Sequence, residues 1–143
     1  MVDDEDYLRI NKYKWYASKN GYARRDIIIN KKKKCIHMHR EIIFAPKEKY
    51  VDHINLIKND NRKNNLRLCN KAQNSMNRPI NRKNKTSKYK GVYFCRYTGR
   101  WRVRLRDGKQ IEIGRFDSEI DAAIAYNHAA KKYFGEFSLL NIV

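Results

Sequence analysis

A carboxylate, an imidazole and two amides lie close together in the middle of the chain, in residue types that suit phosphodiester hydrolysis. Asp52 and His53 are adjacent, Asn65 lies twelve residues beyond His53, and Asn74 lies nine beyond Asn65. Carboxylate and amide oxygens are ligands that a hard divalent ion prefers, so Asp52 and Asn74 could bind one and leave positions for water and a phosphate oxygen. Such an ion stabilises the leaving oxygen and the charge that grows on phosphorus. His53 can take a proton from water near neutral pH, which makes it the candidate general base.

The flanking residues predict two strands and a helix that would position these four side chains. An apolar strand ends at Asp52, a polar loop follows, and Leu66–Leu68 predicts a second strand antiparallel to the first. Asn70 is typical of a helix N-cap, so a helix is expected from Lys71 to about Asn77. Asn74 would then lie on its first or second turn.

With these elements the stretch VDHINLIKNDNRKNNLRLCNKAQNSM resembles the HNH nuclease family, whose ββα-metal unit has the same strand, loop, strand and helix. The resemblance implies that Asp52 and Asn74 are metal ligands and His53 the general base. It implies that Asn65 is a catalytic-site residue whose side chain pins the loop and orients the histidine. The implied cofactor is Mg²⁺ or another divalent metal such as Mn²⁺, and the implied products carry 5′-phosphate and 3′-hydroxyl ends.

The turn after the DHIN phrase departs from that family. Family members often carry glycines there, whereas Leu56 and Lys58 occupy the region in this chain. The shape of this turn affects how far the His53 side chain can extend towards a substrate. A lone Asp-His pair is usually a surface turn, so the prediction rests on the joint pattern.

The composition independently indicates a polyanionic partner. Lys and Arg number 33 against 15 Asp and Glu, which gives a formal net charge of +18 and an isoelectric point near 10.0. So many positive charges repel one another, which destabilises a compact fold unless a polyanion neutralises them. Nucleic acid is the expected polyanion. Charge alone is also compatible with an RNA-binding protein or a solvated cationic surface.

The cysteines and the hydropathy pattern exclude several classes. Cys35, Cys69 and Cys95 are far apart and form no C-x-x-C, which argues against a structural zinc and fits a reducing compartment. No run approaches the roughly 20 apolar residues of a membrane span, and no apolar leader is present. We expect a soluble intracellular protein, in the host cytoplasm or nucleus if it is viral. We expect it to bind no membrane and no small-molecule substrate, and we favour a monomer.

A basic segment, RPINRKNKTSKYK, divides the chain. It holds six Lys or Arg and no acid, and Pro79 stands near its start, which predicts an exposed linker. We expect this linker to follow a phosphate backbone, although a flexible spacer would look the same. Its predicted DNA contacts are Arg78, Arg82, Lys83 and Lys85.

The strongest strand signal lies downstream, in the segment RWRVRLR. Strict alternation places Trp101, Val103 and Leu105 on one face and four arginines on the other. Neighbouring apolar alternations, at Val92 and Phe94 and at Ile111 and Ile113 after an Asp107-Gly108 turn, predict a three-stranded antiparallel meander.

A helix is predicted after this meander. Ser118 with Asp121 approximates a capping box, and Gly135 suits the position after the last turn. Alanines at helical spacing would let the helix approach the sheet closely. The arginine face would then stay open for the major groove of DNA, which admits a β-sheet.

These residues resemble the AP2/ERF DNA-binding domain, known from plant transcription factors and also found fused to phage and viral HNH nucleases. The matching phrases are YKGVYF, GRWRVRLR, IGRFDSEIDAAIAYNHAA and GEFSLLN. Glu112 departs from the pattern, because plant members commonly place a DNA-stacking tryptophan there, so their target sequence does not carry over. The predicted DNA contacts are Lys90, Tyr93, Arg96, Arg102, Arg104 and Arg106, with Arg100 on the same arginine face.

The first 50 residues predict short strands around an Asn20-Gly21 turn, with Lys31–Lys34 as a basic hairpin tip or loop. We expect this region to pack around Trp15. Met38–Ala45 fits either a short helix or a strand end. Arg40 is predicted to approach a phosphate, and His39 could be structural or functional.

The combined prediction is an α+β protein in four parts. These are an N-terminal β-rich segment (1–50), a ββα-metal HNH core (51–77), a basic linker (78–89) and an AP2/ERF-like domain with a three-stranded antiparallel sheet packed on one helix (90–143). The implied function is a metal-dependent DNA endonuclease of the homing type, nicking or cutting both strands of double-stranded DNA. The alternatives are a non-catalytic DNA-binding regulator that retains the HNH scaffold, and an RNA-binding basic protein.

Overall fold

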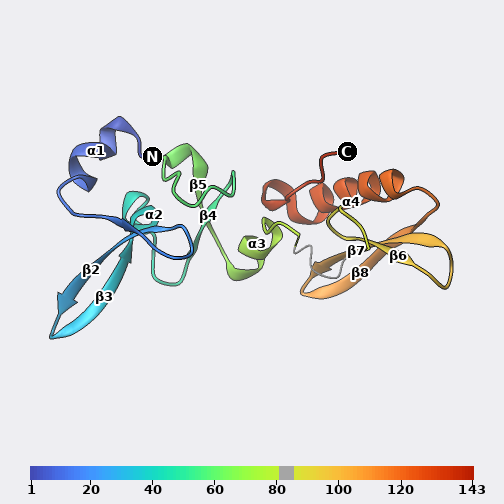
Figure 1. Ribbon diagram of the computed structural model, residues 1–143, viewed down its shortest axis with the longest axis horizontal. Coiled ribbons are helices and arrows are strands. Elements are labelled where there is room, and N and C mark those ends of the chain that lie inside the picture. Colours follow the sequence, from blue (N-terminus) through green and yellow to red (C-terminus); the bar gives the residue numbers. More distant parts are fainter. Residues whose placement is uncertain (81–85) are drawn as a thin grey trace. The chain divides into compact units, whose positions relative to one another are not determined.

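The computed structural model describes residues 1–80 and 86–143, which form two compact units, Met1–Asn74 and Ser75–Val143 (Figure 1). Each unit combines antiparallel strands with helices, which confirms the α+β class. Arg82, Lys83 and Lys85 lie outside the described residues. Within the described ranges, no helix is both long and apolar enough to span a membrane.

The N-terminal unit begins with a helix and a three-stranded antiparallel sheet of order β1-β2-β3. The predicted Asn20-Gly21 turn is present, with Gly21 at φ 83°. The next turn differs from the expectation, because Asn30 and Lys31 form it with positive φ angles and the following lysines belong to a strand. Helix α1 was not predicted, and the 38–45 segment proves helical at its start. The elements are α1 (Asp4–Ile10), β1 (Tyr16–Ala17), β2 (Ala23–Ile29), β3 (Lys32–His37) and α2 (Met38–Ile42).

A small apolar core holds these elements to the next hairpin. Ile10 from α1, Ile42 from α2 and Leu66 from β5 are buried together with Met38. Trp15 packs against this cluster, as expected, and its indole Nε1 donates to the Ile10 carbonyl at 2.8 Å. The core therefore fixes the position of the strand that carries Leu66.

The predicted strand, loop, strand and helix follow in that order. Strands β4 (Tyr50–His53) and β5 (Leu66–Cys69) pair antiparallel, with η1 (Lys63–Asn65) between them, and α3 (Lys71–Met76) comes next. Asn70 caps α3 as predicted. Its side-chain Oδ1 accepts from the Gln73 amide at 2.8 Å, and Gln73 Oε1 accepts from the Asn70 amide at 2.9 Å.

The C-terminal unit is a three-stranded antiparallel sheet of order β6-β7-β8 with one long helix packed along it (Figure 1). Ser118 caps the helix, because its hydroxyl accepts from the amides of Ile120 and Asp121 at 3.2 and 3.3 Å. Gly135 ends it with φ 53°. The elements are β6 (Val92–Cys95), β7 (Arg100–Asp107), β8 (Lys109–Phe116), α4 (Glu119–Phe134) and η2 (Gly135–Phe137).

The core of this unit lies between the sheet and α4. Val103 and Leu105 are buried there, which confirms the inward face predicted from alternation, and buried alanines of α4 pack against them. The close packing explains why residue 91 is a glycine, which also has a φ of 75°. A Cβ at Gly91 would stand 2.2 Å from a ring carbon of Tyr126.

One irregularity interrupts the β7–β8 ladder. Val103 pairs with Gly114, but Arg104 pairs with Glu112, so Ile113 is an extra residue on β8. The shift places Glu112 opposite an arginine.

Candidate functional site

The carboxylate of Asp52 is fixed at the end of β4 by the opposite residue of β5. Asp52 and Arg67 are direct cross-strand partners. The Arg67 guanidinium donates to Asp52 Oδ2 from Nε at 2.9 Å and from Nη2 at 2.7 Å, and both side chains are largely buried. Arg67 therefore sets the orientation of the predicted metal-ligand carboxylate.

His53 is buried beside it, and its ring is oriented by Asn61. His53 Nε2 lies 3.3 Å from Asn61 Oδ1. The Asn61 amide nitrogen donates to the Asn59 carbonyl at 3.2 Å, which assigns its oxygen to the histidine side. Because Asn61 Oδ1 can only accept, this hydrogen bond requires a proton on His53 Nε2.

The environment keeps His53 in the form that a base requires. Burial lowers the pKa of His53 below its ordinary 6.5, while the hydrogen bond to Asn61 Oδ1 and the charges of Asp52 and Asp60 oppose that shift. A neutral imidazole is thus the dominant state near neutral pH, and it can accept a proton.

Asn65 ties together the loop that follows His53. Its Oδ1 accepts from the Asn55 amide at 2.9 Å, and its Nδ2 donates to the Asp60 carbonyl at 2.8 Å. The buried Asp60 carboxylate adds a second tie, because it accepts from Asn55 Nδ2 at 2.8 Å and from two nitrogens of Arg62. The loop is held from within by side chains at both of its ends.

The departure from glycine in this loop is now explained. Leu56 adopts φ 66°, a left-handed conformation that costs a non-glycine residue about 1 kcal/mol. Its amide donates to the His53 carbonyl at 3.0 Å. The turn keeps the shape that glycine would favour, and it does so directly after the candidate base.

A cluster of aromatic side chains lies against His53. The His39 ring centroid is 5.1 Å from that of His53 and 5.3 Å from those of His37 and Tyr22. His39 is buried with no hydrogen bond to its Nδ1, and burial followed by the charges of neighbouring histidines lowers its pKa to about 3. His39 is therefore part of the wall of the site.

Asn74 lies on α3, the helix that follows β5. It is half-buried there, with its amide bonded to the Asn70 carbonyl at 3.0 Å. Among residues 1–80 and 86–143, no hydrogen bond or ion pair joins Asn74 to Asp52 or His53. The structure brings Asp52, His53 and Asn65 together and leaves Asn74 on the adjoining helix.

The donor atoms of Asp52 and Asn74 match a hard divalent ion in chemical type. One carboxylate and one amide supply oxygen ligands, and Mg²⁺ typically takes few ligands from protein and several from water and phosphate. Two side chains that orient the site residues were not predicted from the sequence. These are Arg67, which contacts Asp52, and Asn61, which contacts His53. Strand register alone places Arg67 opposite Asp52, but Asn61 lies in a loop with no periodic signal.

Two predicted phosphate contacts have structural partners. The Arg40 guanidinium donates to the carbonyls of Lys49, Ala45 and Pro46. These hydrogen bonds fix the segment that follows α2. Lys90 is half-buried, and its ammonium donates to the Met76 carbonyl. Burial lowers the pKa of Lys90 to about 8. Arg78 is exposed, as a linker contact would require.

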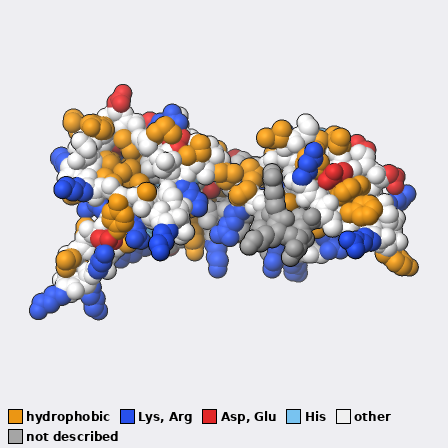
Figure 2. All heavy atoms as spheres, in the orientation of Figure 1, with side chains coloured by type: hydrophobic (Ala, Val, Ile, Leu, Met, Phe, Trp, Pro, Cys, Tyr) orange, Lys and Arg blue, Asp and Glu red, His pale blue; other side chains and the backbone are white. Residues whose placement is uncertain are grey.

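The predicted arginine face is present on the side of the sheet opposite the core. Tyr93 pairs with Arg102 across β6 and β7, and Arg106 and Arg96 are exposed. Arg100 forms an ion pair with Asp117 at 2.9 Å. Further Lys side chains gather at the β2–β3 tip, as Figure 2 shows.

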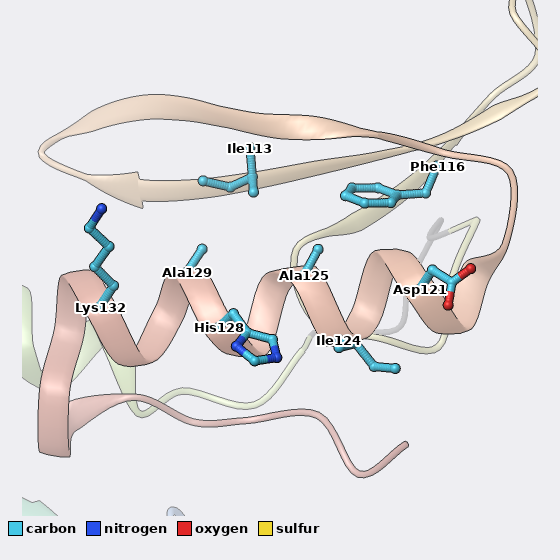
Figure 3. Close-up of a pocket in the computed structure, with 8 residues that line it drawn as sticks. All are labelled: Ile113, Phe116, Asp121, Ile124, Ala125, His128, Ala129 and Lys132. Carbon is cyan, nitrogen blue, oxygen red and sulfur yellow. The ribbon is translucent and has the colours of Figure 1, made fainter.

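A hollow of about 510 Å³ lies between β8 and α4 (Figure 3). Ile113 and Phe116 form its roof, and Ala125 and Ala129 its floor. None of the predicted site residues lines it.

Comparison with known proteins agrees with both halves of this picture. Residues 45–76 match the family model described as HNH endonuclease. An uncharacterised HNH endonuclease of Acanthamoeba polyphaga mimivirus is 33% identical over 138 residues, which cover 92% of this chain and 68% of that protein. No solved structure matches the chain.

The C-terminal region is similar to plant transcription factors. The AP2-like ethylene-responsive transcription factor TOE2 of Arabidopsis thaliana is 45% identical over 62 residues, 43% of this chain and 13% of that protein. APETALA2-like protein 2 of Oryza sativa subsp. indica is 46% identical over 54 residues, 37% of this chain and 12% of that protein. The chain thus spans only a small part of the plant proteins, whereas it spans two thirds of the viral one. It belongs to the HNH endonuclease family, and its C-terminal region is similar to AP2-like plant transcription factors.

Proposed function

We propose that this chain is a metal-dependent DNA endonuclease of the homing type, in which His53 is the general base. The observation that carries the proposal is the buried His53 next to Asp52, with its ring in contact with Asn61. Separate cutting and binding units support the homing type, because targeting then depends on a surface other than the site of chemistry.

The protein's own residues account for the proton transfer. His53 accepts the proton of the attacking water, and the contact of its Nε2 with Asn61 holds the ring in place. Asn65 and Asp60 hold the loop so that the ring keeps its orientation. This pre-set geometry means that little reorganisation is needed at the moment of reaction.

Asp52 and Asn74 would hold the divalent ion, Mg²⁺ or Mn²⁺. The ion, when bound, supplies stabilisation of the leaving 3′ oxygen and of the charge on phosphorus. Arg67 keeps the Asp52 carboxylate oriented through two hydrogen bonds.

The C-terminal sheet would bind duplex DNA through its arginine face. Tyr93, Arg102, Arg104 and Arg106 lie on or beside that face, and the net charge of the chain supports binding to a polyanion. We retain the parts 1–50, 51–77, 78–89 and 90–143 as the proposed division, with residues 78–89 following a phosphate backbone.

The test is cleavage of supercoiled plasmid by the wild type and by His53→Ala, each with Mg²⁺, with Mn²⁺ and with EDTA. We expect nicked or linear product with either metal, none with EDTA, and a loss of at least about 100-fold in His53→Ala. His128→Ala is the matched control, because His128 is exposed on α4 and should leave cutting unchanged. Circular dichroism of each variant excludes unfolding as the cause.

Binding measured in EDTA separates the alternatives. An enzyme of the proposed kind retains salt-sensitive duplex binding in His53→Ala. Duplex binding without cutting by any version under any metal would favour a regulator, and displacement of duplex DNA by equimolar RNA would favour an RNA-binding protein.

A further inference from the structure

Two arginines face each other directly on the DNA-binding sheet. Arg102 in β7 and Arg115 in β8 are cross-strand partners. Like charges in such positions destabilise a sheet. Glu112 bridges them, because its Oε2 accepts from Arg102 Nη2 at 2.5 Å and its Oε1 accepts from Arg115 Nε at 3.2 Å.

The extra residue in β8 brings Glu112 to this face. Arg104 pairs with Glu112, and Arg104 Nη2 lies 3.5 Å from Glu112 Oε2. In an unbroken register Arg104 would pair with Ile113, and Glu112 would stand opposite Leu105, a residue of the core. The irregularity thus places one carboxylate among three guanidinium groups.

This cluster is open to a ligand. The side chains of Arg102 and Arg104 are 26% and 30% exposed, and those of Arg115 and Glu112 are 49% and 37% exposed. A phosphate that approached these arginines would meet the Glu112 carboxylate at the same donors.

We propose that Glu112 determines the specificity of DNA binding by this sheet, an inference that rests on the proposed function. Its carboxylate competes with phosphates for Arg102, Arg104 and Arg115, which weakens sequence-independent binding. The same hydrogen bonds hold Arg102 and Arg104 in a fixed orientation, as bidentate contact with a base edge requires. Phosphate contacts alone carry no sequence information, so a residue that suppresses them raises the ratio of specific to non-specific affinity.

The experiment compares the full chain with Glu112→Gln and with Asp121→Asn, all in EDTA. Asp121→Asn makes the same change in net charge, but Asp121 is exposed on α4, which packs on the face of the sheet that carries Val103 and Leu105. The probes are a pool of random 30-base-pair duplexes and the duplex that the wild type enriches most from it. Each is titrated over a series of salt concentrations.

We expect Glu112→Gln to bind the random pool at least about fivefold more tightly, with a salt slope steeper by about 0.9 for one added phosphate contact. Its preference for the enriched duplex should fall at least about tenfold. Glu112→Asp retains the charge but shortens the side chain. It should keep the wild-type salt slope and lose the preference for the enriched duplex. This variant gives a second readout if circular dichroism shows that Glu112→Gln is misfolded.

Three results would overturn the inference. One is an equal change in Glu112→Gln and Asp121→Asn, which would indicate net charge alone. Another is a lower melting temperature with unaltered binding, which would make Glu112 only a structural bridge. The third is a wild type that does not bind duplex DNA, which refutes the DNA-binding half of the proposed function as well. Failure of cleavage alone would leave these binding measurements intact, so the two proposals fail separately.

Discussion

Acidification should destabilise the N-terminal unit through His39. Its pKa is lowered to about 3 in the folded protein, first by burial and then by the charges of His53 and His37. In the unfolded chain His39 takes up a proton near its ordinary pKa of 6.5. The unfolded state therefore binds more protons between these values, so stability is fully present above about pH 6.5 and is lost as the pH falls. For this one group the loss from about pH 7 to about pH 5 is about 2 kcal/mol, a large part of the usual stability of a domain.

The assay is urea unfolding at several pH values in a Trp101→Phe background, which leaves Trp15 as the reporter of the N-terminal core. His39→Leu has a similar volume and removes the unpaired Nδ1, so stability near neutral pH should change by less than about 1 kcal/mol. Its acid slope should fall by about 1.4 kcal/mol per pH unit. Cys35→Leu, at an exposed site in β3, controls for the new side chain. A wild-type acid slope in His39→Leu would refute the reasoning.

Three further substitutions test backbone conformation. Gly91→Ala should destabilise the C-terminal unit by about 3 kcal/mol, because the new Cβ meets the Tyr126 ring at a left-handed residue, whereas Gly99→Ala, also at positive φ but in open space, should cost only about 1 kcal/mol. Thermal unfolding followed by Trp101 fluorescence in a Trp15→Phe background measures both, and equal losses would contradict the packing argument. Leu56→Gly should raise stability in urea by about 0.5 to 1 kcal/mol, since glycine relieves the left-handed conformation at the expense of a more flexible unfolded chain. A loss of stability there would show that the Leu56 side chain contributes more than its backbone costs.

The fold of the C-terminal unit was predictable because its signals are local. Alternation in β7 identifies Val103 and Leu105 as core residues, and Ser118 and Gly135 mark the ends of α4 through cap chemistry. The register shift at Arg104 was not predictable, because a ladder irregularity depends on how two strands meet.

Helix α1 shows the opposite case. It spans only seven residues, and its N-cap Asp3 makes no side-chain capping hydrogen bond. Its acidic first turn fits the helix dipole, but a short helix gains most of its stability from packing, here through Ile10. Such a helix leaves little trace in a sequence pattern.

For the candidate site, residue types were predictable and the supporting contacts were not. The spacing indicated Asp52, His53 and Asn65, and the structure places all three around one hairpin. The interactions that orient them come from Arg67, across the strand, and from Asn61, inside a loop. The first contact depends on how two strands pair and the second on the conformation of a loop. Neither can be read from residue types alone.

The two departures from family pattern, Leu56 and Glu112, are accommodated in different ways. Leu56 keeps a strained backbone because Asn65 and Asp60 tie the loop around it, so side-chain hydrogen bonds replace the freedom of glycine. Glu112 keeps its place through charge, since hydrogen bonds from Arg102 and Arg115 lower its pKa to about 2 and Arg104 lies 3.5 Å from its carboxylate. The first change leaves the hydrogen bonds of Asn65 and Asp60 across this loop in place. The second would change which groups the proposed DNA-binding face presents, so we expect differences in target preference between this chain and the plant proteins to originate at Glu112 and its arginine partners.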